Sequence, residues 1–279
     1  MSTTTTPPLG TTPFETDHRR PRLQGKVTFV TGGTRGIGAA ISRSFAEQGA
    51  IVAAGFGRDT ENAGALLAEL RDHGVDASIH QGNVGSADDC RRTVAEVIDT
   101  HGRLDILVNN AGITIDKTVH KMTDEDWYKV IAVNLSGAFF MSQAVLPHMI
   151  DRGTGRIVNI SSIIGEIGNI GQANYAASKS GLFGLTKTLA REACYQLAKA
   201  GKLGEDSIGV TVNTVAPGFI ATEMLEHIPE KVLERIRAQI PVGRLGRPDE
   251  VARTVHFLVS DHSSVITGQI FSVTGGQEM

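Results

Sequence analysis

The sequence predicts an α/β protein built on a single doubly wound parallel sheet of about seven strands, with helices on both faces. From Lys26 onward, short runs of β-branched residues alternate with longer helical patterns, as βαβ units require. Most of these runs are too apolar to have a face in solvent, so helices must cover both sides of the sheet. A glycine cluster follows the first run and leads directly into the first helical pattern.

Seven segments are predicted as strands, and neither a repeat of fixed period nor a linker interrupts them. They are Val27–Thr31, Ile51–Ala54, Ser78–Gln81, Ile106–Asn109, Arg156–Ile160, Val210–Val215 and Ile270–Val273. With 279 residues, the chain is long enough for one large domain with a sizeable core. We therefore expect one domain over residues 23–279.

Two stretches fall outside this pattern. Residues 1–22 are rich in Thr and Pro and lack an apolar run, so we expect a flexible tail rather than a signal peptide or a membrane anchor. A transit peptide is the alternative, favoured by three arginines and disfavoured by two acidic residues. The segment Ala193–Gly209 continues a helix past Leu197 and then becomes rich in Gly and acidic residues, which predicts a solvent-exposed insertion.

The composition excludes several classes of protein. Hydrophobic residues make up 41% and charged residues 20% of the chain, which is typical of a globular protein. A net charge of −3 with scattered histidines offers no basic stripe for a nucleic acid, and the histidines form no metal-binding pattern. Cys90 and Cys194 form no disulfide framework, so we expect buried, apolar thiols in a reducing compartment such as the cytoplasm.

The glycine cluster predicts a Rossmann-type nucleotide site. Its residues are Thr31, Gly32, Gly33, Thr34, Arg35, Gly36, Ile37 and Gly38. They lie between a strand and a helix, where glycines let the backbone approach a pyrophosphate and the free N–H groups of the helix N-terminus bind it. A tight βα turn without a ligand is the alternative, and the position between strand and helix favours the nucleotide site.

The end of the second strand distinguishes NADP from NAD. An NAD-preferring site places an acidic side chain there, on the ribose 2′-hydroxyl. This chain instead continues Gly55-Phe56-Gly57-Arg58. Arg58 and Arg35 offer fixed positive charge and a planar fork suited to a 2′-phosphate, so NADP(H) is the predicted cofactor. Asp59 leaves NAD open, because a one-residue shift in the turn puts a carboxylate at the ribose.

Three residues have the types and spacing of a proton-transfer site. Tyr175 and Lys179 are four residues apart on a helical pattern, so both face the same ligand. A phenol with a pKa near 10 transfers protons inefficiently at neutral pH, and a neighbouring cation favours its ionised form. Ser162, at the end of the fifth strand, can hydrogen-bond a carbonyl oxygen as charge develops there. Each residue alone has an ordinary structural explanation; their combination beside a glycine loop favours catalysis.

Together these motifs resemble the short-chain dehydrogenase/reductase family over about residues 24–279. The glycine loop has that family's TGxxxGxG spacing, Asn109-Asn110-Ala111-Gly112 matches its NNAG turn, and Pro217-Gly218 matches its PG turn. The resemblance implies that Ser162, Tyr175 and Lys179 are catalytic. It also implies a fourth catalytic residue, Asn134, which holds a water that links Lys179 to bulk solvent.

The resemblance implies further cofactor contacts. Asn83-Val84 stand where most of the family has Asp-Val against the adenine, and the Asn side chain keeps a carbonyl acceptor. The other expected cofactor-binding residues are Asn110, Ala111, Gly112, Tyr175, Lys179, Pro217, Gly218, Ile220 and Thr222.

The resemblance also implies a homotetramer, because the family is commonly tetrameric.

Local segments narrow the substrate. Asn109–Asp116, Lys121–Thr123, Gly168–Lys179, Ala216–Thr222 and Ile240–Gly246 look like the bacterial 3-oxoacyl-thioester reductases, and two shorter segments look slightly more like acetoacetyl-CoA reductases. The resemblance implies NADPH-dependent reduction of acetoacetyl-CoA or a 3-oxoacyl group on acyl carrier protein to the (3R)-hydroxyacyl thioester. It also places Ile170, Gln172 and Phe219 in the substrate walls.

Three other functions stay open at this point. The chain could be a dehydrogenase of another secondary alcohol, such as a sugar, polyol or steroid, because fold does not fix specificity. It could be a catalytically silent nucleotide-binding regulator, or a scaffold subunit in which NADP serves only folding. The presence of all four catalytic residue types favours an enzyme.

Overall fold

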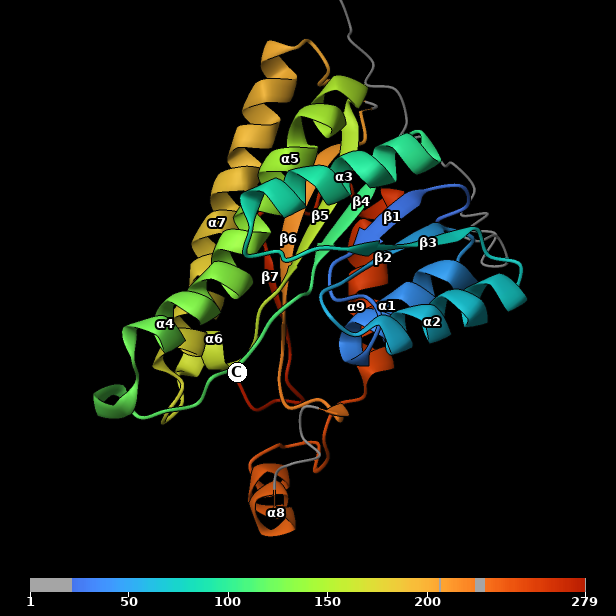
Figure 1. Cartoon of the computed structure of the whole chain (residues 1–279). Coiled ribbons are helices and arrows are strands. Elements are labelled where there is room, and N and C mark those ends of the chain that lie inside the picture. The colour runs from blue at the N-terminus through green and yellow to red at the C-terminus, as the bar shows by residue number, and fades with distance from the viewer. Residues whose placement is uncertain (1–21, 206, 224–228, 279) are drawn as a thin grey trace, which may run out of the picture.

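The computed structural model describes residues 22–205, 207–223 and 229–278. Their strands form one parallel sheet in the order β3-β2-β1-β4-β5-β6-β7 (Figure 1). The predicted α/β fold is therefore confirmed, and the predicted strand ends differ from the observed ones by at most two residues. The strands are β1 (Val27–Val30), β2 (Ile51–Phe56), β3 (Ala77–Gln81), β4 (Ile106–Asn109), β5 (Thr154–Ile160), β6 (Gly209–Pro217) and β7 (Ile270–Val273).

The strand order reverses at β1, and this reversal locates the site. The chain builds β1, β2 and β3 outward in one direction, then returns so that β4 pairs with the other edge of β1. The loops that leave β1 and β4 therefore run to opposite faces of the sheet. In open parallel sheets, the crevice at the carboxyl ends of two such strands is where ligands bind.

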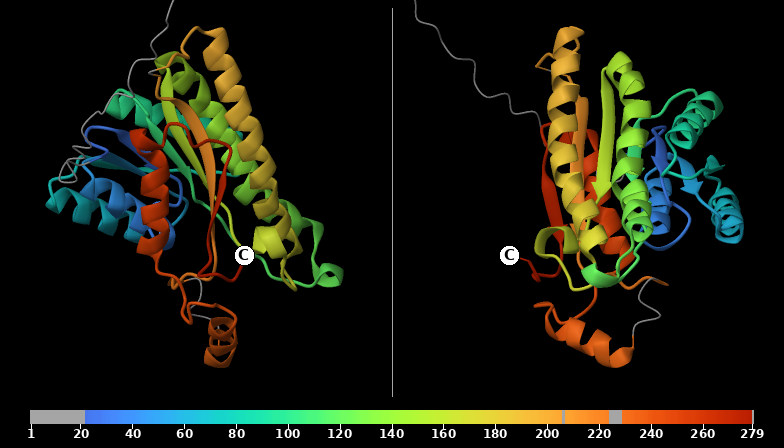
Figure 2. Two further views of the ribbon diagram at one scale, coloured as in Figure 1. Left: turned by 180° about the vertical axis from the view of Figure 1, so that it is seen from behind. Right: turned by 60° about the vertical axis from the view of Figure 1, so that its left-hand side comes forward.

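Helices cover both faces, as the apolar strands require (Figure 2). One core contains Phe45, Leu66 and Val255, and the other contains Val94, Val145 and Leu189. Burial of these side chains supplies the main driving force for the two layers. The helices of the first layer are α1 (Gly36–Glu47), α2 (Thr60–Asp72) and α9 (Pro248–Val259), and those of the second are α3 (Ala87–His101), α5 (Gly137–Arg152) and α7 (Ala173–Lys199).

One continuous helical stretch is long and apolar enough to cross a membrane. It joins α4 (Asp124–Ile131), a π-helical turn (Ala132–Ser136) and α5, and its most apolar 18 residues have a mean hydropathy of 1.5. Met141, Val145 and Met149 of this stretch are buried in the core beside the sheet. The stretch therefore packs as a core helix in this fold.

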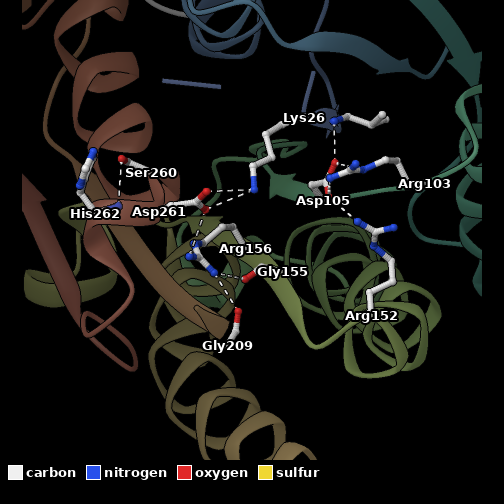
Figure 3. A network of polar contacts seen from close by, with 11 residues as sticks. Lys26, Arg103, Asp105, Arg152, Gly155, Arg156, Gly209, Ser260, Asp261 and His262 are labelled. Atoms are coloured by element: carbon white, nitrogen blue, oxygen red, sulfur yellow. Dashed lines mark hydrogen bonds and ion pairs between the residues drawn. The ribbon is translucent and has the colours of Figure 1, made fainter. Parts of the chain in front are cut away.

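A polar network joins the amino ends of the strands, opposite the crevice (Figure 3). The buried Asp105 carboxylate accepts hydrogen bonds from the backbone N–H of Val27 (2.8 Å), from Arg103 (2.6 and 2.7 Å) and from Arg152 (3.1 Å). Arg156, also buried, donates to two backbone carbonyls at the start of β5 and β6. These side chains therefore hold together the end of the sheet that lies opposite the crevice.

The predicted insertion is partly wrong. Helix α7 extends to Lys199, and Ala193 and Leu197 are fully buried in the core, because the helical periodicity keeps both on the sheet-facing side. Only residues 200–208 connect α7 to β6, and position 206 is outside the described residues.

Two other expectations can be compared with the structure only in part. The predicted tail, residues 1–22, lies outside the described residues except for Arg22, which is exposed. Cys90 is buried as expected, but Cys194 is only half-buried on α7.

Candidate active site

The glycine loop after β1 folds so tightly that side chains are excluded from it. A Cβ atom added to Gly38 would lie 2.1 Å from the carbonyl oxygen of Gly32, and one added to Gly33 would lie 2.6 Å from that of Val30. Gly32 itself has a φ of 59°, in the left-handed region that favours glycine. The loop thus has the bare backbone surface that a pyrophosphate requires.

Thr31 locks this loop to the turn after β4. Its Oγ1 accepts hydrogen bonds from the backbone N–H groups of Asn110 (3.0 Å) and Ala111 (3.1 Å). In return, the Asn110 side chain donates to the carbonyls of Thr31 (3.0 Å) and Gly32 (3.1 Å). The two loops therefore form one rigid floor across the β1–β4 crevice.

The N-terminus of α1 has the properties of an anion site. Its first turn contains no acidic residue, and Arg35 immediately precedes it. The first backbone N–H groups, of Gly36, Ile37 and Gly38, have no partner within the helix and carry the positive end of its dipole. Two residues that follow β6 reach the same place: a carboxylate oxygen of Glu223 lies 3.4 Å, and a methyl carbon of Thr222 3.6 Å, from where a Gly36 Cβ would lie. The backbone of the loop and Arg35 fit the pyrophosphate of a dinucleotide, and the exposed Glu223 side chain must turn away when the pyrophosphate binds.

Asp59 has a structural role that the sequence left open. It is the N-cap of α2, and its carboxylate accepts hydrogen bonds from the backbone (3.1 Å) and side chain (2.7 Å) of Asn62. These bonds, with the nearby positive charge of Arg35, hold the pKa of Asp59 below its usual range. Since the carboxylate is engaged by the helix, it is not free to bind a ribose, and the exposed side chains of Arg35 and Arg58 offer positive charge at the end of β2.

Asn83 and Val84 follow β3, and Asn83 lines an open cavity of about 520 Å³. The backbone N–H of Asn83 donates to Asp89 (2.8 Å), and its side-chain oxygen accepts from Gly85 (3.0 Å). Val84 is half-buried and packs against the core formed by α3 and α5. The cavity is lined by Gly57, Ile79, His80, Gln81, Gly82, Asn83, Asp89, Arg92 and Glu96.

The turn after β6 contributes the other expected cofactor residues. Pro217 ends the strand, and a Cβ on Gly218 would lie 3.0 Å from the Cα of Thr274, so the chain passes close to the end of β7. Ile220 is buried and bridges to Gly246. The segment therefore lies beside the glycine loop, which Thr222 contacts.

Lys179 lies at the centre of the predicted catalytic residues. Its ammonium donates to the carbonyl of Ile160 (2.8 Å), lies 5.6 Å from the centre of the Tyr175 ring, and would be 3.3 Å from a Cβ on Gly112. A glycine in the NNAG turn is thus what lets the ammonium approach. Ser162, two residues after the end of β5, is buried, accepts a hydrogen bond from the backbone N–H of Ile164 (3.2 Å) and lies near enough to Tyr175 to lower the pKa of its hydroxyl.

Burial opposes charge on both catalytic groups. It lowers the pKa of Lys179 to about 8, because a 4% exposed ammonium has lost most of its hydration. Burial also raises the pKa of Tyr175, which the neighbouring Ser162 hydroxyl opposes and the carboxylate of Asp116 increases. This direction is opposite to the lowering expected from Lys179, because burial is the largest cause, and the phenol stays protonated at neutral pH.

Asn134 lies in the π-helical turn between α4 and α5. Its side chain accepts from the N–H of Ile113 (2.9 Å) and donates to the carbonyl of the same residue (3.0 Å) and to Ser178 (3.1 Å). Ser178 in turn donates to the carbonyl of Tyr175 (2.7 Å). Asn134 therefore joins the NNAG turn to the helix that carries the phenol and the ammonium.

Comparison with known sequences identifies the family. The family model described as short chain dehydrogenase matches residues 26–233. The chain belongs to the short-chain dehydrogenase family. It is 46% identical over 255 residues to a protein of Thermotoga maritima named 3-oxoacyl-[acyl-carrier-protein] reductase FabG, covering 91% of this chain and 98% of the relative. Proteins named acetoacetyl-CoA reductase, from Shinella zoogloeoides and Rhizobium meliloti, are 48% and 49% identical, each covering 90% of this chain and 98% of the relative.

Membership of the short-chain dehydrogenase family confirms the resemblance read from the motifs. It makes the chain an oxidoreductase that acts on CH–OH and C=O groups with a nicotinamide nucleotide. The glycine loop, the NNAG turn and the α1 N-terminus described above provide a site that fits such a nucleotide.

The three predicted substrate residues of this short-chain dehydrogenase differ in their surroundings. Gln172 is half-buried and donates to both carboxylate oxygens of Asp116 (3.1 Å each), which joins the loop before α7 to the loop after β4. Phe219 is half-buried beyond β6, but Ile170 is 90% exposed.

Sequence reasoning assigned no role to three polar residues around Tyr175. These are Asp116, Ser178 and the buried Asn174, whose side chain accepts from the N–H of Tyr175 (2.7 Å) and donates to the carbonyl of Ile115 (3.1 Å). Ser178 lies three residues after Tyr175, a helical spacing that could have revealed it. Asp116 and Asn174 act through loop contacts, which leave no periodic signal.

Proposed function

We propose that this chain uses NADPH to reduce a 3-oxoacyl thioester, acetoacetyl-CoA or a 3-oxoacyl group on acyl carrier protein, to the (3R)-hydroxyacyl thioester. The observation that carries the proposal is the pair of Ser162 and Tyr175 beside the buried Lys179 ammonium, with the phenol's pKa raised by burial so that it stays protonated. That pair suits a carbonyl oxygen that gains hydrogen bonds and a proton.

Each of the four residues has a role in this proposal. The nicotinamide, when bound, supplies a hydride for the carbonyl carbon. Ser162 and Tyr175 donate hydrogen bonds to the carbonyl oxygen, and Tyr175 gives it a proton as negative charge develops there. Lys179 stabilises the phenolate that remains, and Asn134 holds a water through which a proton returns to the phenol.

The preference for NADPH rests on the end of β2. Gly55 and Phe56 put no acid at the ribose, and Asp59 is engaged as the N-cap of α2. Arg35 and Arg58 are exposed there and carry fixed charge suited to a 2′-phosphate. Equal affinity for NADH and NADPH would contradict this part of the proposal.

The thioester substrate is supported by the relatives and by the loops around the site. The similar proteins are named as reductases of 3-oxoacyl carrier protein or acetoacetyl-CoA, and each is covered almost completely. Segments 109–116 and 168–179, which carry this resemblance, are joined by the bond between Gln172 and Asp116. With Phe219 they offer a wall that is partly apolar and carries one amide.

The decisive experiment follows NADPH oxidation by absorbance with acetoacetyl-CoA, a 3-oxoacyl carrier protein, a sugar ketone and a steroid ketone. We expect kcat/KM for a thioester to exceed that for the other ketones, because the remote pantetheine arm adds binding energy. Chiral analysis of the product should give the (3R) alcohol. Preference for a sugar or steroid would establish the other secondary-alcohol dehydrogenase, and NADPH binding without any turnover would indicate a regulator or scaffold.

The proposal includes a cytoplasmic homotetramer, as is common in the family. Exposed aromatic side chains on the outer surfaces of α4, α5 and α7 support self-association, because large apolar groups in solvent mark interaction surfaces. They are Trp127, Tyr128, Phe139 and Tyr195, between 37% and 69% exposed. Light scattering of the purified protein should give four times the chain mass; a monomer would contradict this part.

A further inference from the structure

A ladder of polar side chains crosses the core beneath the catalytic residues. Asn109, Asn159 and Thr214 are register neighbours on β4, β5 and β6, and none is more than 5% exposed. Asn109 donates to Asn159 (2.9 Å), Asn159 donates to Thr186 on α7 (2.8 Å), and the Thr186 and Thr214 hydroxyls lie 2.7 Å apart. Asn109 also donates to Ser142 on α5 (3.2 Å).

The ladder reaches the same helix that carries the phenol and the ammonium. Three consecutive residues bond to α7. Asn159 and Ile160, the last two residues of β5, bond to Thr186 and to the Lys179 ammonium (2.8 Å), and Ser161, which follows the strand, donates to the Lys179 carbonyl (2.8 Å). Thr186 is seven residues after Lys179, which puts it two turns along the same face of α7. Figure 2 shows this long helix alongside α5 over one face of the sheet.

Two hydrogen-bonded positions two helical turns apart fix the placement of α7 on the sheet more completely than one position does. Apolar contacts are non-directional and let a helix slide, whereas hydrogen bonds need a definite distance and angle. The bond at Lys179 alone lets α7 pivot about it, and the bond at Thr186 removes that freedom. Near Lys179, α7 has little room to move, because a Cβ on Gly165 would lie 2.9 Å from the backbone of Lys179.

In the structure the two amides of the ladder point in the same direction. Asn159 uses its carbonyl oxygen to accept from Asn109, so its amide N–H is the group that meets Thr186. The Thr186 oxygen accepts this bond and can donate its own proton to Thr214. Removal of the Thr186 hydroxyl therefore leaves a buried amide N–H without a partner.

We propose that Thr186 and Asn159 are positioning residues that set the axial register of α7, and thereby the places of the Lys179 ammonium and the Tyr175 hydroxyl. The inference rests on the proposed function for those two groups. Neither Thr186 nor Asn159 touches the reacting atoms. The ladder contacts α7 below the site, so it affects the rate of the reaction rather than the binding of the thioester.

The test compares three variants. Thr186→Val keeps the shape and removes the hydroxyl, and Thr186→Ser keeps the hydroxyl as a conservative rescue. Thr28→Val is the matched control, because Thr28 is equally buried but its hydroxyl bonds to the carbonyl of Ile51 at the far end of the sheet. For each protein, kcat, KM, the thermal midpoint and the pH dependence of kcat/KM are measured.

We expect Thr186→Val to lower kcat about tenfold with little change in KM, because small misplacements of reacting groups are costly. Thr186→Ser should restore most of kcat. Thr28→Val should keep the kcat of the parent even if its thermal midpoint falls by a similar amount. If Thr186→Val keeps the parent kcat and pH dependence, the hydroxyl is merely structural and the inference fails.

A readout without turnover separates this inference from the proposed function. Ultraviolet difference absorbance follows ionisation of Tyr175. The same titration of the matching Tyr175→Phe protein is subtracted, which removes the signals of the other tyrosines. In Thr186→Val we expect the phenol's midpoint to move at least about half a pH unit toward that of a free phenol, because a displaced helix admits water. An unchanged midpoint would overturn the inference even if the parent reduces no thioester, and a shifted one would support it in that case too.

Discussion

Raising the pH should switch off the reductase through Lys179, near pH 8 rather than above pH 10. The buried ammonium has its pKa lowered from 10.5 to about 8 by loss of hydration. That difference corresponds to about 3 kcal/mol in favour of the neutral amine. At pH 7 about nine-tenths of the molecules keep the charge, and at pH 9 about one-tenth do.

The assay is kcat/KM for acetoacetyl-CoA at saturating NADPH, measured from pH 6 to 10. We expect about a tenfold fall between pH 7 and pH 9, because a neutral amine cannot stabilise the phenolate that Tyr175 leaves behind. Binding of NADPH, followed by fluorescence at each pH, separates loss of cofactor from loss of chemistry.

Salt tests the cause of the shift. Burial is what lowers the pKa of Lys179, and no neighbouring charge contributes among the described residues. Salt screens exposed charges and has little effect on desolvation. The alkaline midpoint should therefore be the same at low and high ionic strength. A midpoint near 10, or one that moves with salt, would refute the reasoning.

Four further predictions follow from single residues. Tyr175→Phe should lower kcat by about 10²-fold or more while NADPH still binds, measured by turnover and fluorescence; retained turnover would exclude the phenol as proton donor. Arg58→Ala should weaken NADPH binding by about 1.5–3 kcal/mol and leave NADH unaffected in titrations. Burial lowers the pKa of His80, so the unfolded chain binds a proton more readily than the folded one, and the free energy of unfolding should fall as the pH drops below about 6.5. Between pH 7.5 and 5.5, urea unfolding of His80→Gln should show a fall in this free energy that is smaller than the parent's by up to about 1 kcal/mol. Thr211→Val should raise the free energy of unfolding by about 1 kcal/mol, because the Thr211 hydroxyl is buried without a partner among the described residues; a loss would indicate a bridging water.

The sequence predicted the strands well because the signal is local. Val27, Ile106 and Ile157 lie in short apolar runs, and burial of both sheet faces makes such runs continuous. The glycine loop could be predicted for the same reason, since Gly38 must be small wherever the backbone of Gly32 passes this close. Structural features that depend on residues close together in the sequence can be predicted from the sequence.

Features that depend on distant contacts could not be predicted in this way. Asp59 was ambiguous because only the start of α2 decides whether its carboxylate caps a helix or faces a ribose. Thr186 and Asn159 are 27 residues apart and look like ordinary polar residues in apolar surroundings. The sign of the pKa shift at Tyr175 depends on how much water the fold excludes, which spacing alone does not reveal.

Burial of the two catalytic groups also bears on the direction of the reaction. It favours the neutral forms of both the phenol and the amine, so the resting site at pH 7 contains a protonated phenol and an ammonium held at a cost. When a carbonyl oxygen takes the phenol's proton, the new negative charge lies near that ammonium, and the attraction offsets the cost of having kept it charged. Oxidation of an alcohol needs the opposite resting state, with the phenol ionised first, and burial disfavours that state. The same dehydration of the site therefore keeps the resting enzyme in the protonation state that reduction uses, whereas the reverse reaction needs the phenol to be ionised first.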